Sequence, residues 1–107
     1  MVIKDEILKK ENDFYSLCKN HKVKTLYAFG SSTNNNFNPV ESDIDLLVEI
    51  DDADPIERGE NLMSFWDRLE SFFDRKVDLL TESSLRNPFL RKSIDSTKVL
   101  IYDGSRQ

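Results

Sequence analysis

The sequence predicts an α/β protein with a small mixed sheet of about four strands and helices packed mainly on one face. Three observations predict this fold. Short β-branched and aromatic runs alternate with amphipathic helical segments, a full helix separates the second run from the third, and the link between the first two runs is short. At 107 residues, without repeats or long linkers, residues 1–107 are expected to form a single domain.

The first half of the chain is expected to form a helix over residues 2 to about 20 and strands over 23–29 and 43–50. The first strand ends at Gly30. Residues 31–42 are turn-forming, with room for one short helical turn after Ser31. A link of this length is too short for a parallel crossover, so it favours antiparallel or oblique pairing of the two strands.

The second half begins with a helix whose start is marked by its sequence. Asp54 is the expected N-cap, Pro55 fits the first helical position and Glu57 completes a capping-box pattern. The helix is expected to run to about Phe73, and its length favours parallel pairing of the strands that flank it. Three elements follow: a strand over 76–80, a short helix from residue 88 carrying Phe89, Leu90 and Ile94, and a strand over 98–102.

Several residues that often carry function are expected to be structural here. Cys18 has no cysteine partner and is expected to be a small buried hydrophobe. His21 falls in a polar link and is expected to be exposed to solvent. The aromatic residues Phe65, Trp66, Phe72 and Phe73 could form a binding platform, but their helical spacing favours core packing. The acidic run at 51–54 is expected to be a solvated turn with the helix cap.

Composition excludes some classes of function. The formal net charge is −5, and because duplex binding depends on Lys and Arg neutralising phosphates, no direct nucleic-acid binding is expected. No apolar run approaches the length of a membrane span, so no membrane association is expected. With one cysteine and no signal-peptide pattern at the N-terminus, the expected location is the cytoplasm.

Two aspartates stand out in the second strand. Asp43 and Asp45 are separated by one residue within an apolar run, and on a strand such residues point to the same face. Two carboxylates side by side on a largely buried strand repel each other and lose hydration, which is costly unless a cation compensates. The pair is therefore a candidate magnesium site.

A third aspartate interrupts the next strand. Asp78 lies between Val77 and Leu79, so it faces away from the side that these two residues bury. If the two strands are neighbours, the three carboxylates form a cluster suited to two-metal phosphoryl chemistry. Asp43 and Asp45 would bridge the two ions. Asp78 would bind on the nucleophile side and help to remove the proton from an attacking hydroxyl.

The turn after the first strand is a candidate phosphate-binding element. A glycine at the end of a strand lets the backbone approach a ligand closely, and Gly30 occupies that position. The N–H groups and hydroxyls of Ser31 and Ser32 are candidates to hold phosphate oxygens at the start of a helical turn. Alone the Gly-Ser-Ser pattern is a common turn, but its position before the aspartate strand makes the combination specific.

With these motifs the chain resembles the nucleotidyltransferases of the DNA polymerase beta superfamily. The resemblance covers about residues 23–102 and is carried by Phe29-Gly30-Ser31, by Ser42-Asp43-Ile44-Asp45-Leu46-Leu47-Val48 and by Val77-Asp78-Leu79-Leu80. The short chain resembles the minimal nucleotidyltransferases, which lack a second substrate-binding domain. The resemblance implies Mg²⁺-dependent transfer of a nucleoside monophosphate with release of pyrophosphate, with Asp43, Asp45 and Asp78 as metal ligands and Gly30 and Ser31 at the triphosphate.

Many minimal members are antitoxins whose partner is an α-helical HEPN-domain ribonuclease toxin. The resemblance therefore implies transfer of AMP from ATP to a tyrosine of such a toxin. Two alternatives remain open. One is a catalytically degenerate protein that neutralises a partner by binding alone, and the other is transfer to a small molecule such as an aminoglycoside, which is weaker because those enzymes carry an additional domain.

The chain departs from the family pattern in the loop between Gly30-Ser31 and Asp43. The eleven residues at 32–42 are one more than usual, a change that a loop tolerates easily. The same segment lacks the arginine that members often carry there. A neighbouring cation such as Lys24 or Arg91 is then needed at the phosphates.

Overall fold

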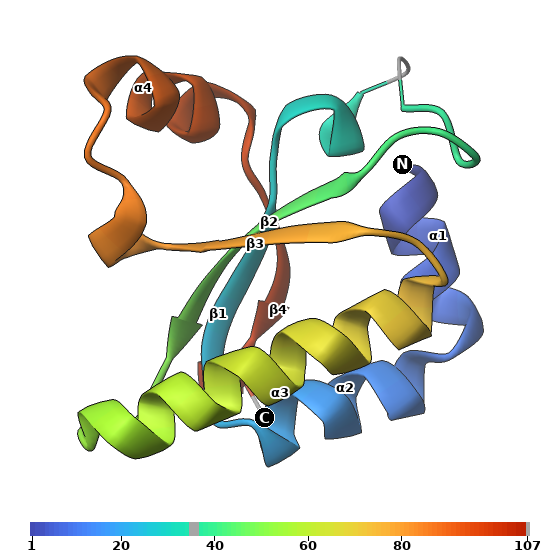
Figure 1. The fold of residues 1–107 in the computed structure, drawn as a ribbon. Helices are drawn as coiled ribbons and strands as arrows, with labels where there is room; N and C mark the ends of the chain where they lie inside the picture. Colours follow the sequence, from blue (N-terminus) through green and yellow to red (C-terminus); the bar gives the residue numbers. More distant parts are fainter. Residues whose placement is uncertain (35–36, 107) are drawn as a thin grey trace.

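The structure is a computed structural model that describes residues 1–34 and 37–106, so positions 35–36 of the polar loop lie outside it. The helices and strands are α1 (Val2–Lys9), α2 (Glu11–Asn20), β1 (Val23–Ala28), β2 (Ile44–Ile50), α3 (Pro55–Phe73), β3 (Val77–Thr81), α4 (Pro88–Thr97) and β4 (Val99–Asp103). The strands form one four-stranded sheet in the order β3-β2-β1-β4 (Figure 1). The predicted fold class is confirmed, and the strand ends differ from prediction by a residue or so.

Both predicted strand pairings are confirmed. β1 pairs antiparallel with β2, and β2 pairs parallel with β3 across the crossover made by α3. β4 joins the other edge of β1 in the antiparallel direction. The parallel register between β2 and β3 places Asp45 directly opposite Asp78.

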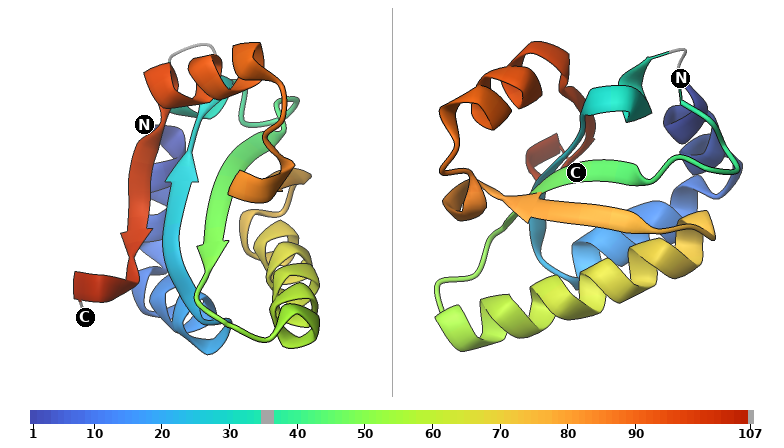
Figure 2. Two further views of the ribbon diagram at one scale, coloured as in Figure 1. Left: turned by 90° about the vertical axis from the view of Figure 1, so that its left-hand side faces the viewer. Right: turned by 45° about the horizontal axis from the view of Figure 1, so that its top comes forward.

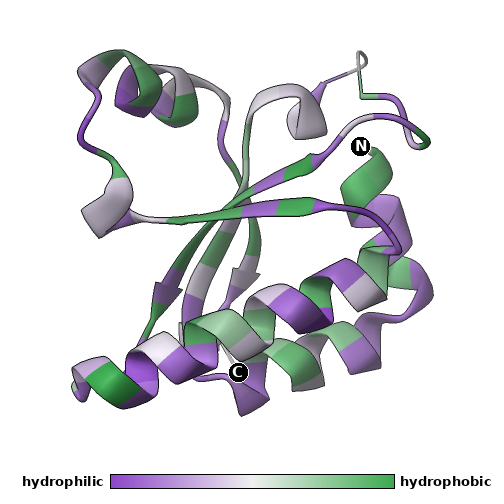
Figure 3. Ribbon diagram, viewed as in Figure 1, coloured by the Kyte–Doolittle hydropathy of each residue, from purple (hydrophilic) through white to green (hydrophobic). Residues whose placement is uncertain are grey.

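The helices cover the sheet unequally. The main core cluster lies between one sheet face and α1, α2 and α3, and it includes Phe14, Leu26, Leu46 and Phe65, each fully buried. Figure 2 shows these three helices along the sheet and α4 at one end of it. In Figure 3 hydrophobic and hydrophilic residues alternate along the strands, as period-2 elements with one covered face require. A smaller cluster under α4 joins Phe29, Leu47 and Ile94 on the other face.

The prediction of one helix over residues 2–20 is wrong. The segment forms two helices that meet at Lys10, whose backbone leaves the helical region with φ −138° and ψ 47°. Ile3 and Ile7 anchor the first helix and Phe14 and Cys18 the second. A single straight helix would also bury a residue between these two pairs, but the residues at that position are charged and exposed. The break at Lys10 lets each half turn its own apolar pair into the core.

The start of α3 follows its sequence in part. The Asp54 carboxylate accepts a hydrogen bond from the Ile56 N–H (3.0 Å), which confirms Asp54 as the N-cap. Glu57 was expected to complete a capping box, but its carboxylate accepts from Lys22 Nζ (2.7 Å). Lys22 also pairs with Asp52 at 3.6 Å, so the acidic turn is held to the turn between α2 and β1.

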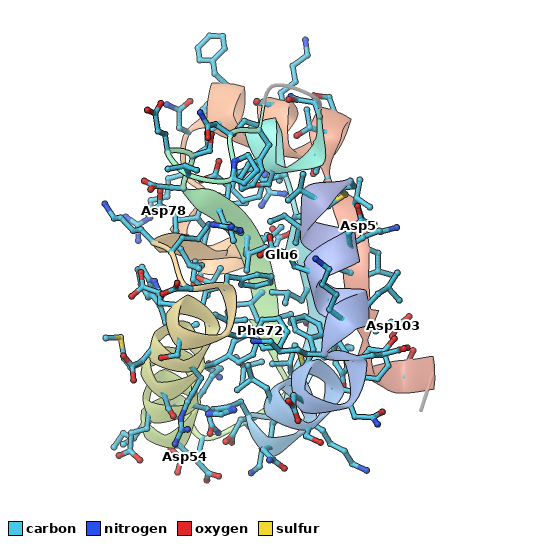
Figure 4. The ribbon with its side chains drawn as sticks, turned by 90° about the vertical axis from the view of Figure 1, so that its right-hand side faces the viewer. Asp5, Glu6, Asp54, Phe72, Asp78 and Asp103 are labelled. Carbon is cyan, nitrogen blue, oxygen red and sulfur yellow. The ribbon has the colours of Figure 1, made fainter. Side chains whose placement is uncertain are left out.

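The aromatic residues of α3 are confirmed as core. Phe65 and Phe73 are buried, and the half-buried Trp66 donates from its indole N–H to the Val77 carbonyl (2.7 Å). Phe72 lies between α2 and α3 (Figure 4), with its ring centroid 5.4 Å from that of Phe14. These contacts fix α3 to the first residue of β3.

Of the two predictions made for Cys18 and His21, one is confirmed and one is wrong. Cys18 is fully buried, as predicted, and its burial raises the pKa of the thiol. The prediction that His21 is an exposed loop residue is wrong. Its Nδ1 bonds to the Leu17 carbonyl (2.8 Å) and its Nε2 to Ser64 Oγ (2.9 Å), so the half-buried ring joins α2 to α3.

The helix α4 is less covered than its apolar residues suggest. Asn87 caps it by accepting from the Phe89 N–H (2.9 Å) and the Leu90 N–H (3.4 Å). Of the three apolar residues predicted on it, Ile94 is buried, Leu90 is 40% exposed and Phe89 is 83% exposed. Helical periodicity identifies an apolar stripe, but α4 contacts the sheet near its C-terminal end, which leaves Phe89 uncovered.

None of the helices in the described part of the chain has the length and apolar character needed to span a membrane.

Candidate active site

The structure brings two of the three candidate aspartates together. Asp45 on β2 and Asp78 on β3 are register partners on adjacent parallel strands. Their apolar neighbours Ile44, Leu46, Val77 and Leu79 point into the core, so both carboxylates lie on the face of the sheet away from α1–α3. Figure 4 places Asp78 far from Asp54, which separates this pair from the acidic turn before α3.

Asp43 lies at the edge of this pair. It is exposed and comes one residue before β2 begins, although the sequence predicted it within the strand. The backbone there already follows the ladder, because the Ile44 N–H donates to the Lys76 carbonyl (3.0 Å). Within residues 1–34 and 37–106, no three acidic, histidine or cysteine side chains are grouped closely enough to hold a metal ion, so the three carboxylates do not form a closed cage.

The electrostatics of Asp45 show that the three carboxylates influence one another. Partial burial raises the pKa of Asp45, and the negative charges of Asp78 and then Asp43 raise that pKa further. The ionised form is therefore disfavoured relative to an exposed aspartate. A nearby cation would relieve this cost, which is the property expected of a metal ligand.

The turn after β1 approaches the aspartate closely. Gly30 begins a 3₁₀ turn (Gly30–Thr33) with a φ of +63°, and a Cβ added there would lie 3.2 Å from Asp45 Oδ2. The turn is tied to β2 because the Phe29 N–H donates to the Asp45 carbonyl (3.1 Å). Glycine is needed here for two reasons, since a left-handed backbone disfavours a side chain and the carboxylate occupies the space.

The two serines of the turn differ in their surroundings. Ser32 is buried and its Oγ accepts from the Asp45 N–H (3.0 Å), so its side chain fixes the strand that carries the aspartate. Ser31 is half-buried. Ser31 thus has the more accessible side chain of the two candidate phosphate-binding serines.

The structure places neither expected substitute for the loop arginine at this turn as a free cation. Lys24 lies at the opposite end of β1 from Gly30 and is 4.0 Å from a Glu49 carboxylate oxygen. Arg91 lies on α4 and pairs with Glu82 at 2.5 Å. Lys76 is a cation that sequence reasoning missed. It is exposed and lies two residues before Asp78, a spacing that on extended backbone points two side chains to one face.

We expect opposite effects from adding a methyl group at two glycines. Gly30→Ala forces a side chain into the left-handed region and against Asp45, and should lower the free energy of unfolding by about 1–2 kcal/mol. Gly59, within α3, has nothing within 4 Å of an added Cβ. Gly59→Ala should raise stability by about 0.5–1 kcal/mol because alanine is the better helix former. Urea unfolding of both variants measures the difference, and equal effects would contradict the strained turn.

A pH dependence follows from the raised pKa of Asp45. The pKa of Asp45 is higher in the folded chain than in the unfolded chain, so ionised Asp45 disfavours folding. The stability of the fold is therefore highest while Asp45 is protonated, and it falls as the pH rises through the folded pKa. Asp45→Asn should therefore raise the melting temperature of the metal-free protein at pH 7, and the gain should vanish below the unfolded pKa of about 3.9. Thermal unfolding at pH 7 and 3.5 tests this, with the exposed helix residue in Asp67→Asn as control. A gain at pH 3.5 as large as that at pH 7 would rule the explanation out.

Asp45 and Asp78 lie on adjacent strands beside the strand–Gly-Ser turn, and these are the motifs that carry the resemblance to nucleotidyltransferases. The family model described as "Nucleotidyltransferase domain" matches residues 14–101. The chain belongs to the nucleotidyltransferase domain family and is an enzyme of that class.

Relatives in Methanocaldococcus jannaschii are similar over nearly the whole chain. One is "Putative protein adenylyltransferase MJ1379", 35% identical over 96 residues that make up 90% of this chain and 92% of the relative. A second, "Putative protein adenylyltransferase MJ0126", is 36% identical with the same coverage of both chains.

Solved structures with this fold include toxin–antitoxin complexes. "Crystal structure of the toxin-antitoxin with AMP-PNP" matches with 27% identity and a TM-score of 0.58, covering 90% of this chain and 75% of the other. A chain of the tri-AMPylated Shewanella oneidensis HEPN toxin in complex with MNT antitoxin matches with 25% identity and a TM-score of 0.51, covering 90% and 71%. "Structure of putative minimal nucleotidyltransferase" has 21% identity and a TM-score of 0.63, covering 92% and 95%, and shows likeness of fold.

Proposed function

We propose that this nucleotidyltransferase transfers AMP from Mg·ATP to a hydroxyl of a protein acceptor, a tyrosine of a cognate HEPN ribonuclease toxin, and thereby acts as an antitoxin in the cytoplasm. The observation that carries the proposal is the pairing of Asp45 with Asp78 on neighbouring parallel strands beside the Gly30 turn. The M. jannaschii relatives support the AMP-transfer reaction by their names. The AMPylated HEPN toxin of the S. oneidensis complex supports the acceptor.

The donor set fits a divalent cation. Carboxylate oxygens are the ligands that Mg²⁺ prefers, and the charges of Asp78 and Asp43 already disfavour ionised Asp45. Glycine at position 30 keeps the space beside Asp45 Oδ2 free of a side chain. When bound there, Mg²⁺ would supply charge neutralisation at the triphosphate and would activate the attacking hydroxyl.

The residues of the site then have distinct tasks. Asp43 and Asp45 hold the cations, with Asp45 positioned by its backbone bonds to Phe29 and Ser32. Asp78 also binds a cation, and its carboxylate accepts the proton of the acceptor hydroxyl. Gly30 and Ser31 bind the triphosphate, and the exposed Lys76 is our candidate for the positive charge that the missing loop arginine would provide.

The experiment combines the purified chain with ATP, Mg²⁺ and its proposed partner, a HEPN toxin from the same organism. The expected result is one or more AMP groups on a toxin tyrosine, located by mass spectrometry, together with loss of the toxin's ribonuclease activity. Unmodified toxin that is fully active after the incubation would contradict the proposal.

A catalytically degenerate protein that neutralises its partner by contact is the second candidate. Two observations favour it: the loop at 32–42 has no arginine, and the carboxylates of the described residues do not form a closed cage. It predicts that a variant carrying Asp43→Asn and Asp45→Asn still protects cells from the toxin. Loss of protection in that variant, with toxin binding retained, would exclude the contact mechanism.

A further inference from the structure

The last residue of α4 is bonded to the phosphate-binding turn. The Gly30 N–H donates to Thr97 Oγ1 (3.0 Å), joining residues 67 positions apart in the chain. The same hydroxyl donates to the Ser93 carbonyl one helical turn earlier (2.9 Å). Because a hydroxyl has one proton, its bond to Ser93 directs the oxygen lone pairs toward Gly30.

The sheet register explains why these two residues meet. Ala28 pairs with Val99 in the antiparallel ladder of β1 and β4, and the same register extended by two residues brings Gly30 opposite Thr97. The chain is helical at Thr97, so a side-chain oxygen takes the place of the backbone carbonyl that a longer strand would offer. Ile94 packs against Phe29 and holds the helix against this end of β1.

Both polar groups of Gly30 are thus held by threonine hydroxyls. Thr33 Oγ1 donates to the Gly30 carbonyl (2.8 Å), while Thr97 accepts from the Gly30 N–H. The Gly30 N–H is therefore committed within the protein. Gly30 then serves the triphosphate by having no side chain, which lets the phosphates approach its backbone, while the groups that follow it supply the hydrogen bonds to the phosphate oxygens. A left-handed glycine has many accessible conformations, so a contact from a separate helix restricts the turn more than local bonds alone.

We propose that Thr97 is a positioning residue for nucleotide binding, fixing the Gly30 turn in the conformation that receives the triphosphate. The proposal rests on the nucleotide-binding role of that turn in the proposed function. Thr97 acts through Gly30 and makes no contact of its own with the reacting groups. Its removal should weaken the binding of nucleotide more than it slows the transfer step.

The test compares three variants with the wild-type chain. Thr97→Val keeps the β-branched shape and removes the acceptor oxygen, whereas Thr97→Ser keeps the oxygen. Ser96→Ala is the matched control, since Ser96 Oγ makes the same kind of bond to the Ser93 carbonyl (2.9 Å) from the same helix. The Kd for the ATP analogue AMP-PNP with Mg²⁺ is measured by calorimetry, and exchange of the Gly30 amide proton by NMR.

Thr97→Val is expected to raise the Kd about tenfold and to speed exchange of the Gly30 amide, with Thr97→Ser and Ser96→Ala within about twofold of wild type. A wild-type Kd in a folded Thr97→Val protein would overturn the proposal. If Thr97→Val fails to fold, the wild-type chain and Thr97→Ser decide the matter. Fast, unprotected exchange of the Gly30 amide in the wild-type chain would overturn the proposal. Slow exchange of that amide, together with a wild-type Kd for AMP-PNP in Thr97→Ser, would support it. Failure of the wild-type chain to bind AMP-PNP would instead contradict the proposed function.

Discussion

Replacing both Asp43 and Asp45 with asparagine is expected to lower the rate of AMP transfer by about 1,000-fold or more, equivalent to about 4 kcal/mol of transition-state stabilisation. Asparagine keeps the size of each side chain and removes the charge that we propose holds a divalent cation. The variant should fold, because the charges of Asp43 and Asp78 disfavour ionised Asp45 in the wild-type chain. The rate is measured as AMP incorporated into the toxin per unit time.

The control for this variant is Glu49→Gln. Glu49 lies four residues beyond Asp45 on β2, so strand alternation puts it on the same face, and its partner is Lys24 at the far end of β1. This change removes one negative charge from the same strand and should alter the rate by less than about twofold. Transfer that survives in the double aspartate variant would contradict the proposed role of Asp43 and Asp45 as cation ligands.

The largest expected effect on stability comes from Phe65→Ala. Phe65 is fully buried in the cluster that holds α3 against the sheet, and truncating a buried phenylalanine costs about 3–5 kcal/mol. A small domain has only about 5–15 kcal/mol of total stability, so a substantial unfolded population is expected. Urea unfolding measures the change, and a loss below about 1 kcal/mol would contradict the packing described.

Phe89→Ala is the matched control because it removes the same atoms from an exposed site. Phe89 is 83% exposed on α4, so the expected change in the free energy of unfolding is within about 0.5 kcal/mol. The difference between the two variants measures the contribution of burial, because both remove a phenylalanine that the sequence alone places on an apolar helix face.

The sequence predicted the sheet well because its strands are short, apolar and separated by strong turn signals. The parallel pairing of β2 with β3 followed from the crossover implied by α3, and the structure confirms it. The register that places Asp45 opposite Asp78, with Asp43 at the edge, could not be read from the sequence. The break at Lys10 was missed because apolar spacing on both sides continues one helical period, and local patterns do not show where a helix must bend around a core.

The bonds that support the site were harder to predict. The position of Ser32 after Gly30 suggests a phosphate contact, but nothing local in the sequence shows that its hydroxyl accepts from the Asp45 N–H. Thr97 lies 67 residues from Gly30, so its role depends on the register of β4 and the end point of α4. Lys76 had a usable signal, its spacing of two from Asp78, which identifies a charge on the same strand face.

The most direct test of AMP transfer uses ATP labelled at different phosphates. The chain is incubated with Mg²⁺, the HEPN toxin and ATP labelled at either the α- or the γ-phosphate. AMP transfer predicts that the α-label becomes attached to a toxin tyrosine while the γ-label leaves in pyrophosphate. Attachment of the γ-label, or attachment of neither, would contradict the proposal that this chain is a protein adenylyltransferase.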